Sequence, residues 1–225
     1  MRGKPRTFGH RAGVTAVREA TEAAAEVGIK YLTLFAFSTE NWKRPRLEVD
    51  ALMTLLLQTL NAELENLNKN NIRLMTVGDL DSLPSKVRAR LLQTVEQTAN
   101  HDKMTLTLAL SYSGRWEIVE AARRIAKACM EHDLSPEDVD EDVFSSFLET
   151  SHLPHPELLI RTSGESRISN FMLWQVAYSE LCFTSKYWPD FQKEDLFQAI
   201  YDFQQRERRF GKTTEQLVKE GKAIR

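Results

Sequence analysis

The sequence predicts a single α/β domain, spanning residues 1–225, in which helices flank a mostly parallel central sheet. Three observations support this fold class. Short strand-like apolar runs alternate with longer amphipathic segments, no Pro-, Gly- or Ser-rich linker interrupts them, and no internal repeat is visible. The length fits one large domain or two small ones and is sufficient to bury a substantial core.

The first half of the chain predicts three helix–strand pairs. Helices are expected at 12–27, 47–67 and 85–99, and strands at 31–37, 72–77 and 104–110. The first helix is rich in alanine and ends at Gly28, and β-branched and aromatic residues mark the strand that follows it. Leucines recur on one face of the second helix, and Met53 and Leu57 widen that face. This wide face is expected to be mostly core.

The second half predicts shorter elements. A helix is expected to open at Tyr112 and to run to about Cys129, and the acidic stretch 135–142 reads as a loop entering a short helix. Brief buried strands are expected at 158–160 and 181–183. A charged amphipathic helix is expected at 193–208, and a polar tail follows Gly211.

Composition argues against several classes of protein. The formal charge is −2, with 28% charged residues, whereas a nucleic-acid-binding domain is usually strongly basic. The two cysteines, Cys129 and Cys182, form no CxxC pair, so we expect neither a disulfide scaffold nor a zinc knuckle. No apolar run is long enough to span a bilayer and no signal peptide opens the sequence. These features favour a cytoplasmic protein whose membrane contacts are peripheral.

Two polar segments follow apolar runs, at positions where parallel α/β sheets bind ligands. One is 35–42, and the other is 161–170, in which Arg161 and Arg167 bracket serines and a glycine. Arginine binds phosphate through its planar fork, and hydroxyls and backbone amides complete such a site. We therefore expect two walls of one anion-binding site. The alternative is a solvated loop whose arginines pair with Glu165.

Other candidate residues have both a functional and a structural interpretation. Arg6 and His10 precede the first predicted helix, whose N-terminus favours anions, but a solvent-facing pair is the alternative. Trp42 fits either a buried turn or the wall of an apolar substrate site. Asn41 can orient a substrate but is a poor general base. Glu180 lies against an apolar strand and needs a partner, which a metal ion or an arginine would supply.

Standard phosphate-binding motifs are absent from the sequence. It contains no GxxxxGK[ST], no GxGxxG and no aspartate-rich cluster. An anion site would have to be built from Arg, Ser and His. His152 and His155 flank a proline and are expected to belong to a stiff loop rather than to a metal site.

Read together, the motifs resemble the cis-prenyltransferase family in order and over nearly the whole chain. The matching stretches are Arg6-Thr-Phe-Gly-His10-Arg-Ala-Gly13, Phe37-Ser-Thr-Glu-Asn-Trp-Lys-Arg-Pro45, Tyr112-Ser-Gly-Arg-Trp-Glu-Ile118, Arg161-Thr-Ser-Gly-Glu-Ser-Arg-Ile-Ser-Asn-Phe-Met-Leu-Trp-Gln175, Trp188-Pro-Asp190 and Arg206-Glu-Arg-Arg-Phe-Gly211. The resemblance implies the family's fold with an apolar tunnel. It also implies that farnesyl diphosphate is condensed with successive isopentenyl diphosphates, with cis double bonds, to give undecaprenyl diphosphate, a lipid carrier precursor for cell-wall synthesis.

The resemblance also implies a role for each matching residue. Arg6 and His10 would bind the allylic diphosphate, and Asn41 would take part in proton handling. The substrate wall would comprise Ser38, Thr39, Glu40, Trp42 and Arg44. Isopentenyl diphosphate would be bound by Arg161, Arg167, Ile168 and Ser169, and Glu180 would be a ligand of Mg²⁺. Arg209 and Gly211 would complete the site of the partner subunit in a homodimer.

One family motif is not present in the sequence. The family begins with a strand ending in Asp-Gly-Asn-Gly-Arg-Trp, whose Asp is tied to magnesium and catalysis, and this sequence starts beyond it. We therefore expect an N-terminally truncated domain with low activity. A catalytically silent partner subunit is the alternative, although such subunits usually lose the substrate motifs that are intact here. A phosphate-monoester hydrolase is a weaker option because no nucleophile is paired with a base.

Overall fold

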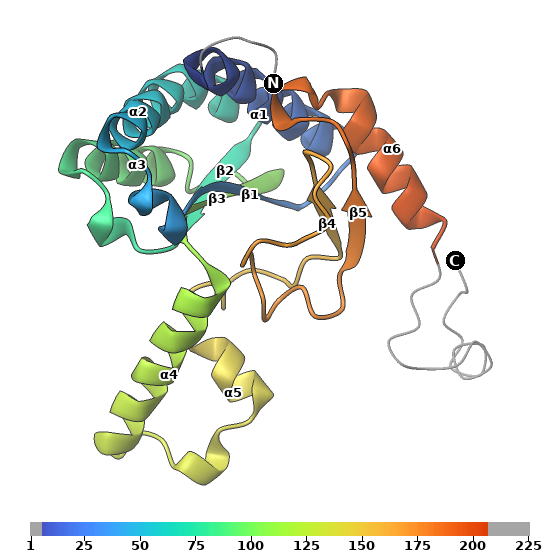
Figure 1. Cartoon of the computed structure of the whole chain (residues 1–225). Coiled ribbons are helices and arrows are strands. Elements are labelled where there is room, and N and C mark those ends of the chain that lie inside the picture. Colours follow the sequence, from blue (N-terminus) through green and yellow to red (C-terminus); the bar gives the residue numbers. More distant parts are fainter. Residues whose placement is uncertain (1–5, 207–225) are drawn as a thin grey trace.

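A computed structural model describes residues 6–206, with side chains from residue 12 onward (Figure 1). The helices are α1 (Arg6–Glu26), α2 (Arg46–Lys69), α3 (Ser85–Gln97), α4 (Gly114–Met130), α5 (Glu141–Ser146) and α6 (Lys193–Gln204). The strands are β1 (Tyr31–Ser38), β2 (Ile72–Val77), β3 (Met104–Tyr112), β4 (Leu158–Arg161) and β5 (Glu180–Phe183). Helices and strands therefore alternate through the first half of the chain, as the sequence predicts.

The predicted parallel α/β fold is confirmed, but the described strands divide between two sheets. In one, β3 lies between β1 and β2, and in the other β4 pairs with β5. Every strand pair among the described residues is parallel. The alternation of helices and strands indicates parallel pairing but does not decide which strands become neighbours. This is why the sequence suggested one continuous sheet.

Helices α1, α2 and α3 cover one face of the three-stranded sheet, and α4 and α5 project from its other side (Figure 1). The main core lies under the first three helices and includes Leu60 and Leu67 of α2 and alternate residues of β3. A smaller core surrounds Tyr112 and includes Leu159 of β4 and Met172. The two cores hold the two sheets and their loops together as one domain.

Several boundaries differ from the sequence-based expectation, and two of the differences fall in motifs that match the family. Helix α1 begins at Arg6, so Arg6 and His10 lie within the helix and not ahead of it. Gly13 lies inside this helix, where its carbonyl accepts a hydrogen bond from Trp188 Nε1 at 3.1 Å. Tyr112 does not open a helix. It ends β3, and α4 begins two residues later after the cap residue Ser113.

Gly78, directly after β2, allows a close approach of backbone segments. Its φ is +123°, and a Cβ atom at this position would lie 2.0 Å from the carbonyl oxygen of Leu110 on β3. Gly28 also has a positive φ, of +81°, but a Cβ atom there would meet nothing within 4 Å. A substitution at Gly28 would therefore add backbone strain alone, whereas one at Gly78 would add backbone strain and a steric clash.

We expect Gly78→Ala to lower the free energy of unfolding by more than about 3 kcal/mol, because the added methyl group overlaps backbone that cannot move away. Gly28→Ala should cost only about 1–2 kcal/mol, the strain of a left-handed alanine. Urea unfolding of both variants measures the difference. Equal losses would show that the contact with Leu110 is not limiting.

Candidate active site

The first polar segment forms a tight turn at the end of β1. The pairing of β1 with β3 shifts register between Phe35 and Phe37, and such bulges re-aim side chains. A 3₁₀ turn at Thr39–Lys43 follows. Asn41 Oδ1 accepts a hydrogen bond from the backbone N–H of Ser38 at 3.1 Å. One side-chain acceptor of Asn41 is therefore used to shape the turn.

Trp42 is held in place by both apolar and polar contacts. Its ring packs edge-on against Phe37, with ring centroids 4.8 Å apart, and its Nε1 donates to Ser111 Oγ at 2.9 Å. Ser111 is 1% exposed, and its Oγ also lies 2.8 Å from Ser82 Oγ. The structural interpretation of Trp42 is therefore supported, and Trp42 is a fixed side chain at the end of the sheet.

The second polar segment leaves the end of β4 and is tied to the end of β5. The backbone N–H of Ser163 donates to the carbonyl of Lys186 at 2.7 Å, and that of Gly164 donates to the carbonyl of Thr184 at 2.9 Å. Ser163 and Gly164 adopt φ values of +76° and +68°. Two consecutive left-handed residues turn the chain back across the end of the two-stranded sheet.

Glu165 forms ion pairs with both arginines of this segment. It contacts Arg161 closely, and Arg167 Nη2 lies 2.7 Å from its Oε1. The hydrogen bond from Arg161 and the positive charge of both arginines hold the pKa of Glu165 below its ordinary value. The arginine–glutamate pairing considered as the structural alternative is therefore present. Arg161 Nε is nevertheless buried and has no hydrogen-bond partner among the described residues.

The two polar segments meet, as the sequence predicts. Asn170 Nδ2 donates to Glu40 Oε1 at 2.7 Å, and the rings of Phe35 and Phe171 stack with centroids 4.5 Å apart. The structure does not bring Arg44 into this contact, because its guanidinium pairs with Glu48 at the start of α2, 3.0 Å away. Arg44 therefore lies on the rim of the first segment.

Glu180 lies at the opposite end of the two-stranded sheet from Arg161. It pairs with Leu158 at the start of β4, whereas Arg161 pairs with Phe183 at the end of β5. Its partner is an arginine: Arg206 Nη1 lies 2.8 Å from Glu180 Oε2. Among residues 12–206, whose side chains the structure describes, no group of three or more His, Cys, Asp or Glu side chains is placed to hold a metal ion. Glu180 therefore offers a single carboxylate.

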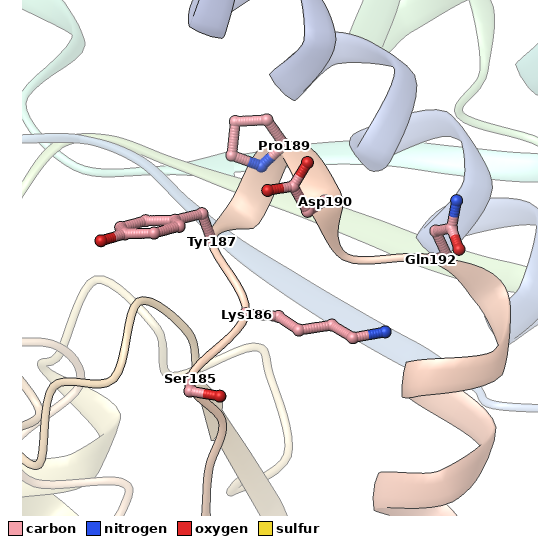
Figure 2. A pocket seen from close by; sticks show the side chains of 6 residues that line it. All are labelled: Ser185, Lys186, Tyr187, Pro189, Asp190 and Gln192. Carbon is pink, nitrogen blue, oxygen red and sulfur yellow. The ribbon is translucent and has the colours of Figure 1, made fainter. Parts of the chain in front are cut away.

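A cavity of about 520 Å³ lies beside the second segment, after the end of β5. Its lining residues are Ser185, Lys186, Tyr187, Pro189, Asp190 and Gln192 (Figure 2). Lys186 and Tyr187 point to opposite sides of the connection that leads from β5 to α6. Because the backbone N–H of Ser163 donates to the carbonyl of Lys186, this cavity adjoins the second polar segment, 161–170, which we call the arginine segment. The sequence predicts no role for Asp190 beyond the matched Trp188-Pro-Asp190 stretch.

The sequence reasoning missed a buried carboxylate, Glu117, in the first turn of α4. Its side chain is 1% exposed and has no cationic partner among the described residues. Tyr112 and Gln175 donate to Oε2 at 2.5 and 2.9 Å. The backbone N–H and the hydroxyl of Thr150 donate to Oε1 at 3.0 and 2.8 Å. The matched Tyr-Ser-Gly-Arg-Trp-Glu motif was the only sequence signal for this residue.

Burial and the adjacent Glu117 carboxylate raise the pKa of Tyr112 well above its ordinary value. The phenol therefore stays protonated and donates to Glu117. Each oxygen of the carboxylate accepts two hydrogen bonds, which compensates for its removal from water. This network connects the end of β3, the start of α4 and the residues that flank the arginine segment.

Comparison with known proteins decides the family. The family model described as "Putative undecaprenyl diphosphate synthase" matches residues 1–211. The chain belongs to this family, the cis-prenyltransferases. It is accordingly a prenyltransferase enzyme. This confirms the resemblance drawn from the six sequence motifs.

Individual relatives agree with this assignment. The chain is 53% identical over 217 residues to a protein of Chlorobaculum tepidum named isoprenyl transferase, covering 96% of this chain and 82% of that protein. It is 47% identical over 215 residues to a Vibrio cholerae protein named ditrans,polycis-undecaprenyl-diphosphate synthase, (2E,6E)-farnesyl-diphosphate specific, covering 96% of this chain and 86% of that protein.

A solved structure shows the same fold. The lavandulyl diphosphate synthase of Lavandula x intermedia, in complex with dimethylallyl diphosphate, superposes with a TM-score of 0.91 at 36% identity. The match covers 94% of this chain and 91% of that one. The cis-prenyltransferase fold predicted from the sequence is therefore confirmed, whereas the apolar tunnel stays a prediction. The side chains of Arg6 and His10, and residues Arg209 and Gly211, lie outside the described part of the chain.

We expect Glu117→Gln to lower the free energy of unfolding by about 2–4 kcal/mol, because the new amide places a donor against groups that already donate. Glu120→Gln on the same helix is the matched control. Glu120 forms an exposed pair with Arg123, and its loss should change stability by less than about 0.5 kcal/mol. Urea unfolding compares them, and similar effects would contradict a special role for Glu117.

Proposed function

We propose that this enzyme transfers isopentenyl units from isopentenyl diphosphate to farnesyl diphosphate, with cis double bonds, and forms undecaprenyl diphosphate. The name of the Vibrio cholerae relative supports this choice of both the product and the farnesyl substrate. Among the structural observations, the state of Arg161 is the one that carries the proposal.

Arg161 is a cation whose hydrogen-bonding capacity is not filled. Its Nε is buried and lacks an acceptor among the described residues, although another nitrogen of the same guanidinium binds Glu165. An unsatisfied buried donor costs free energy, so a ligand oxygen that reached Arg161 Nε would be favoured. A diphosphate oxygen at the end of β4 would fill this role, with Arg167 and the serines completing its shell.

The chemistry fits a site of this kind. Head-to-tail condensation breaks the allylic carbon–oxygen bond, forms a carbon–carbon bond, and releases a proton and diphosphate. Fixed cations stabilise the negative charge that develops on the leaving group. We propose that Arg161, Arg167, Ile168 and Ser169 bind isopentenyl diphosphate. Ser38, Thr39, Glu40, Trp42 and Arg44 would form the facing wall, with Arg6 and His10 on the allylic diphosphate. Asn41 is proposed to orient the reacting groups through its amide.

Magnesium is proposed as the cofactor, with Glu180 as a ligand. Mg²⁺ is usually held by one or two carboxylates together with substrate phosphates. The single carboxylate of Glu180 fits that pattern and does not fit an all-protein cage. When bound, Mg²⁺ would offset the repulsion between two diphosphates. Glu180 would have to exchange its contact with Arg206 for the ion, and Arg206 would then be available to an anion.

The wider setting is also proposed. Undecaprenyl diphosphate would serve as a lipid carrier precursor in cell-wall synthesis. A homodimer is supported by Leu181 and Phe183 of β5, which are 37% and 44% exposed, with Arg209 and Gly211 proposed near the partner's site. None of the helices in the described part of the chain is long and apolar enough to cross a membrane. We propose a cytoplasmic enzyme with peripheral membrane contact during product release.

A catalytically silent partner subunit remains the second candidate. The isolated carboxylate of Glu180 favours it, because catalysis by Mg²⁺ would rely on one recognisable protein ligand. The two polar segments argue against a silent subunit. Arg161 Nε is a buried donor without an acceptor among the described residues, and the hydrogen bond between Asn170 and Glu40 joins the two segments.

We expect labelled isopentenyl diphosphate to be incorporated onto farnesyl diphosphate in a Mg²⁺-dependent reaction, with undecaprenol as the main product after dephosphorylation. The 225-residue chain should be assayed beside the same chain fused to a strand that ends in Asp-Gly-Asn-Gly-Arg-Trp ahead of Met1. We expect far more activity from the fusion. No incorporation by either form would reject the function, and a much longer or shorter product would reject the proposed chain length.

We expect Arg161→Ala and Arg167→Ala each to lower kcat/KM for isopentenyl diphosphate in the active form. The loss of transition-state stabilisation should be about 2–4 kcal/mol, the range for one lost charge-assisted contact or oxyanion donor. Arg88→Ala is the control, because Arg88 forms an exposed pair with Asp81 at α3. Steady-state kinetics with each substrate varied in turn make the test. Wild-type constants in both variants would mean that these arginines are structural.

A further inference from the structure

Asn170 contacts three parts of the active site through its side chain and its backbone. Its Nδ2 donates to Glu40 Oε1 at 2.7 Å, and its Oδ1 accepts from the backbone N–H of Arg115 at 2.9 Å. Its own carbonyl accepts from the backbone N–H of Gly114 at 2.7 Å. The arginine segment, the start of α4 and the turn after β1 therefore share one residue.

The geometry fixes both the orientation and the identity of this side chain. Because Arg115 donates to Oδ1, the Nδ2 group must face Glu40. The backbone of Asn170 has φ +62°, in the left-handed region that asparagine tolerates better than most residues. Asparagine meets all three requirements, because its amide accepts from Arg115, donates to Glu40 and tolerates this backbone conformation.

Glu40 is charged in this contact. Burial acts to raise the pKa of its carboxyl, but hydrogen bonds from Asn170 and from nearby groups outweigh that effect and leave the pKa below its ordinary value. The contact is therefore a charge-assisted hydrogen bond, which is about twice as strong as a neutral one. It joins positions that are 130 residues apart in the sequence.

We propose that Asn170 is a positioning residue that holds the turn at 38–43 against the arginine segment, so that the two substrate segments keep a fixed spacing. The inference rests on the proposed function, because the spacing matters only if each segment binds one of two reacting diphosphates. Reaction between two bound substrates depends steeply on their separation, and a misplacement of about 1 Å can cost on the order of a hundredfold in rate.

The chain contains a matched contact away from this site. Asn71, in the turn between α2 and β2, has φ +56°, and its Nδ2 donates to Asp102 Oδ1 at 2.7 Å. Its carbonyl also accepts a backbone hydrogen bond, from Lys103 at 3.1 Å. Asn71 therefore reproduces the local chemistry of Asn170 without joining the two substrate segments.

The test is an exchange of hydrogen-bonding groups across the contact. Asn170→Asp keeps the acceptor for Arg115 and tolerates the backbone conformation, but it sets a carboxylate against Glu40. In the double variant Asn170→Asp with Glu40→Gln, an amide again faces a carboxylate, with the donor on the other side. We expect Asn170→Asp to lower kcat about tenfold or more, with smaller changes in either KM. The double variant should return to within about threefold of Glu40→Gln alone.

Hydrogen exchange supplies a second measurement that does not depend on turnover. Amide exchange in segment 38–43 should rise in Asn170→Asp and return towards the wild-type rate in the double variant. Asn71→Asp should leave kcat unchanged and alter exchange only near its own turn. The proposal would be overturned if Asn170→Asp lowered kcat equally in the wild-type background and in the Glu40→Gln background. Unchanged amide exchange in 38–43 would overturn it as well. If the wild-type enzyme condenses no substrates, the proposed function fails, and the exchange data alone decide the role of Asn170.

Discussion

The carboxylate of Glu117 is almost fully buried, and the elements that carry the active site meet at it. Tyr112 ends β3, Thr150 lies ahead of β4, and Gln175 follows the arginine segment, and all three donate to this one group. A buried carboxylate without donors would be costly, so the fold is favourable only when these segments converge. The convergence also places Gly114 and Arg115, directly before the network, within reach of Asn170. The arginine segment and the turn after β1 are therefore linked, through Asn170, to the start of α4, which carries this network.

A second constraint is the backbone of the site, which adopts the left-handed region at several non-glycine residues. Ser163, Ser169, Asn170 and Met172 have φ values between +46° and +76°, and Ser111 at the end of β3 has φ +50°. Such conformations are costly for residues with a Cβ atom and persist where surrounding contacts impose them. Here those contacts are visible, because Ser163 bonds to Lys186, and Ser111 holds Trp42 and Ser82. The strain is concentrated where side chains must be aimed across the ends of the strands.

The sequence predicted what depends on periodicity and local chemistry. The alternating elements, their parallel direction and the meeting of segments 35–42 and 161–170 all follow from apolar patterns and from the rule that ligands collect at strand ends. Features set by distant contacts were missed. The hydrogen bond from Trp188 to the Gly13 carbonyl of α1 joins residues far apart in the sequence, and the four donors of Glu117 come from three separate regions. Glu180 shows the limit most clearly: local reasoning required a partner, and only the fold reveals that Arg206 supplies it.

The charge balance of the arginine segment explains how two guanidinium groups are stable side by side. Two such cations repel, and Glu165 between them offsets that repulsion while remaining ionised. Under the proposed function, a diphosphate would bring more negative charge and more acceptor oxygens than one carboxylate, so it would displace Glu165 from one or both arginines without leaving a cation unpaired. The buried Nε of Arg161 would then give the diphosphate a donor that Glu165 does not satisfy. Glu180 and Arg206 repeat this arrangement at the other end of β5, where an ion pair occupies groups that Mg²⁺ and an anion would separate. In both places an internal ion pair balances charged groups that the proposed substrate or Mg²⁺ would bind instead.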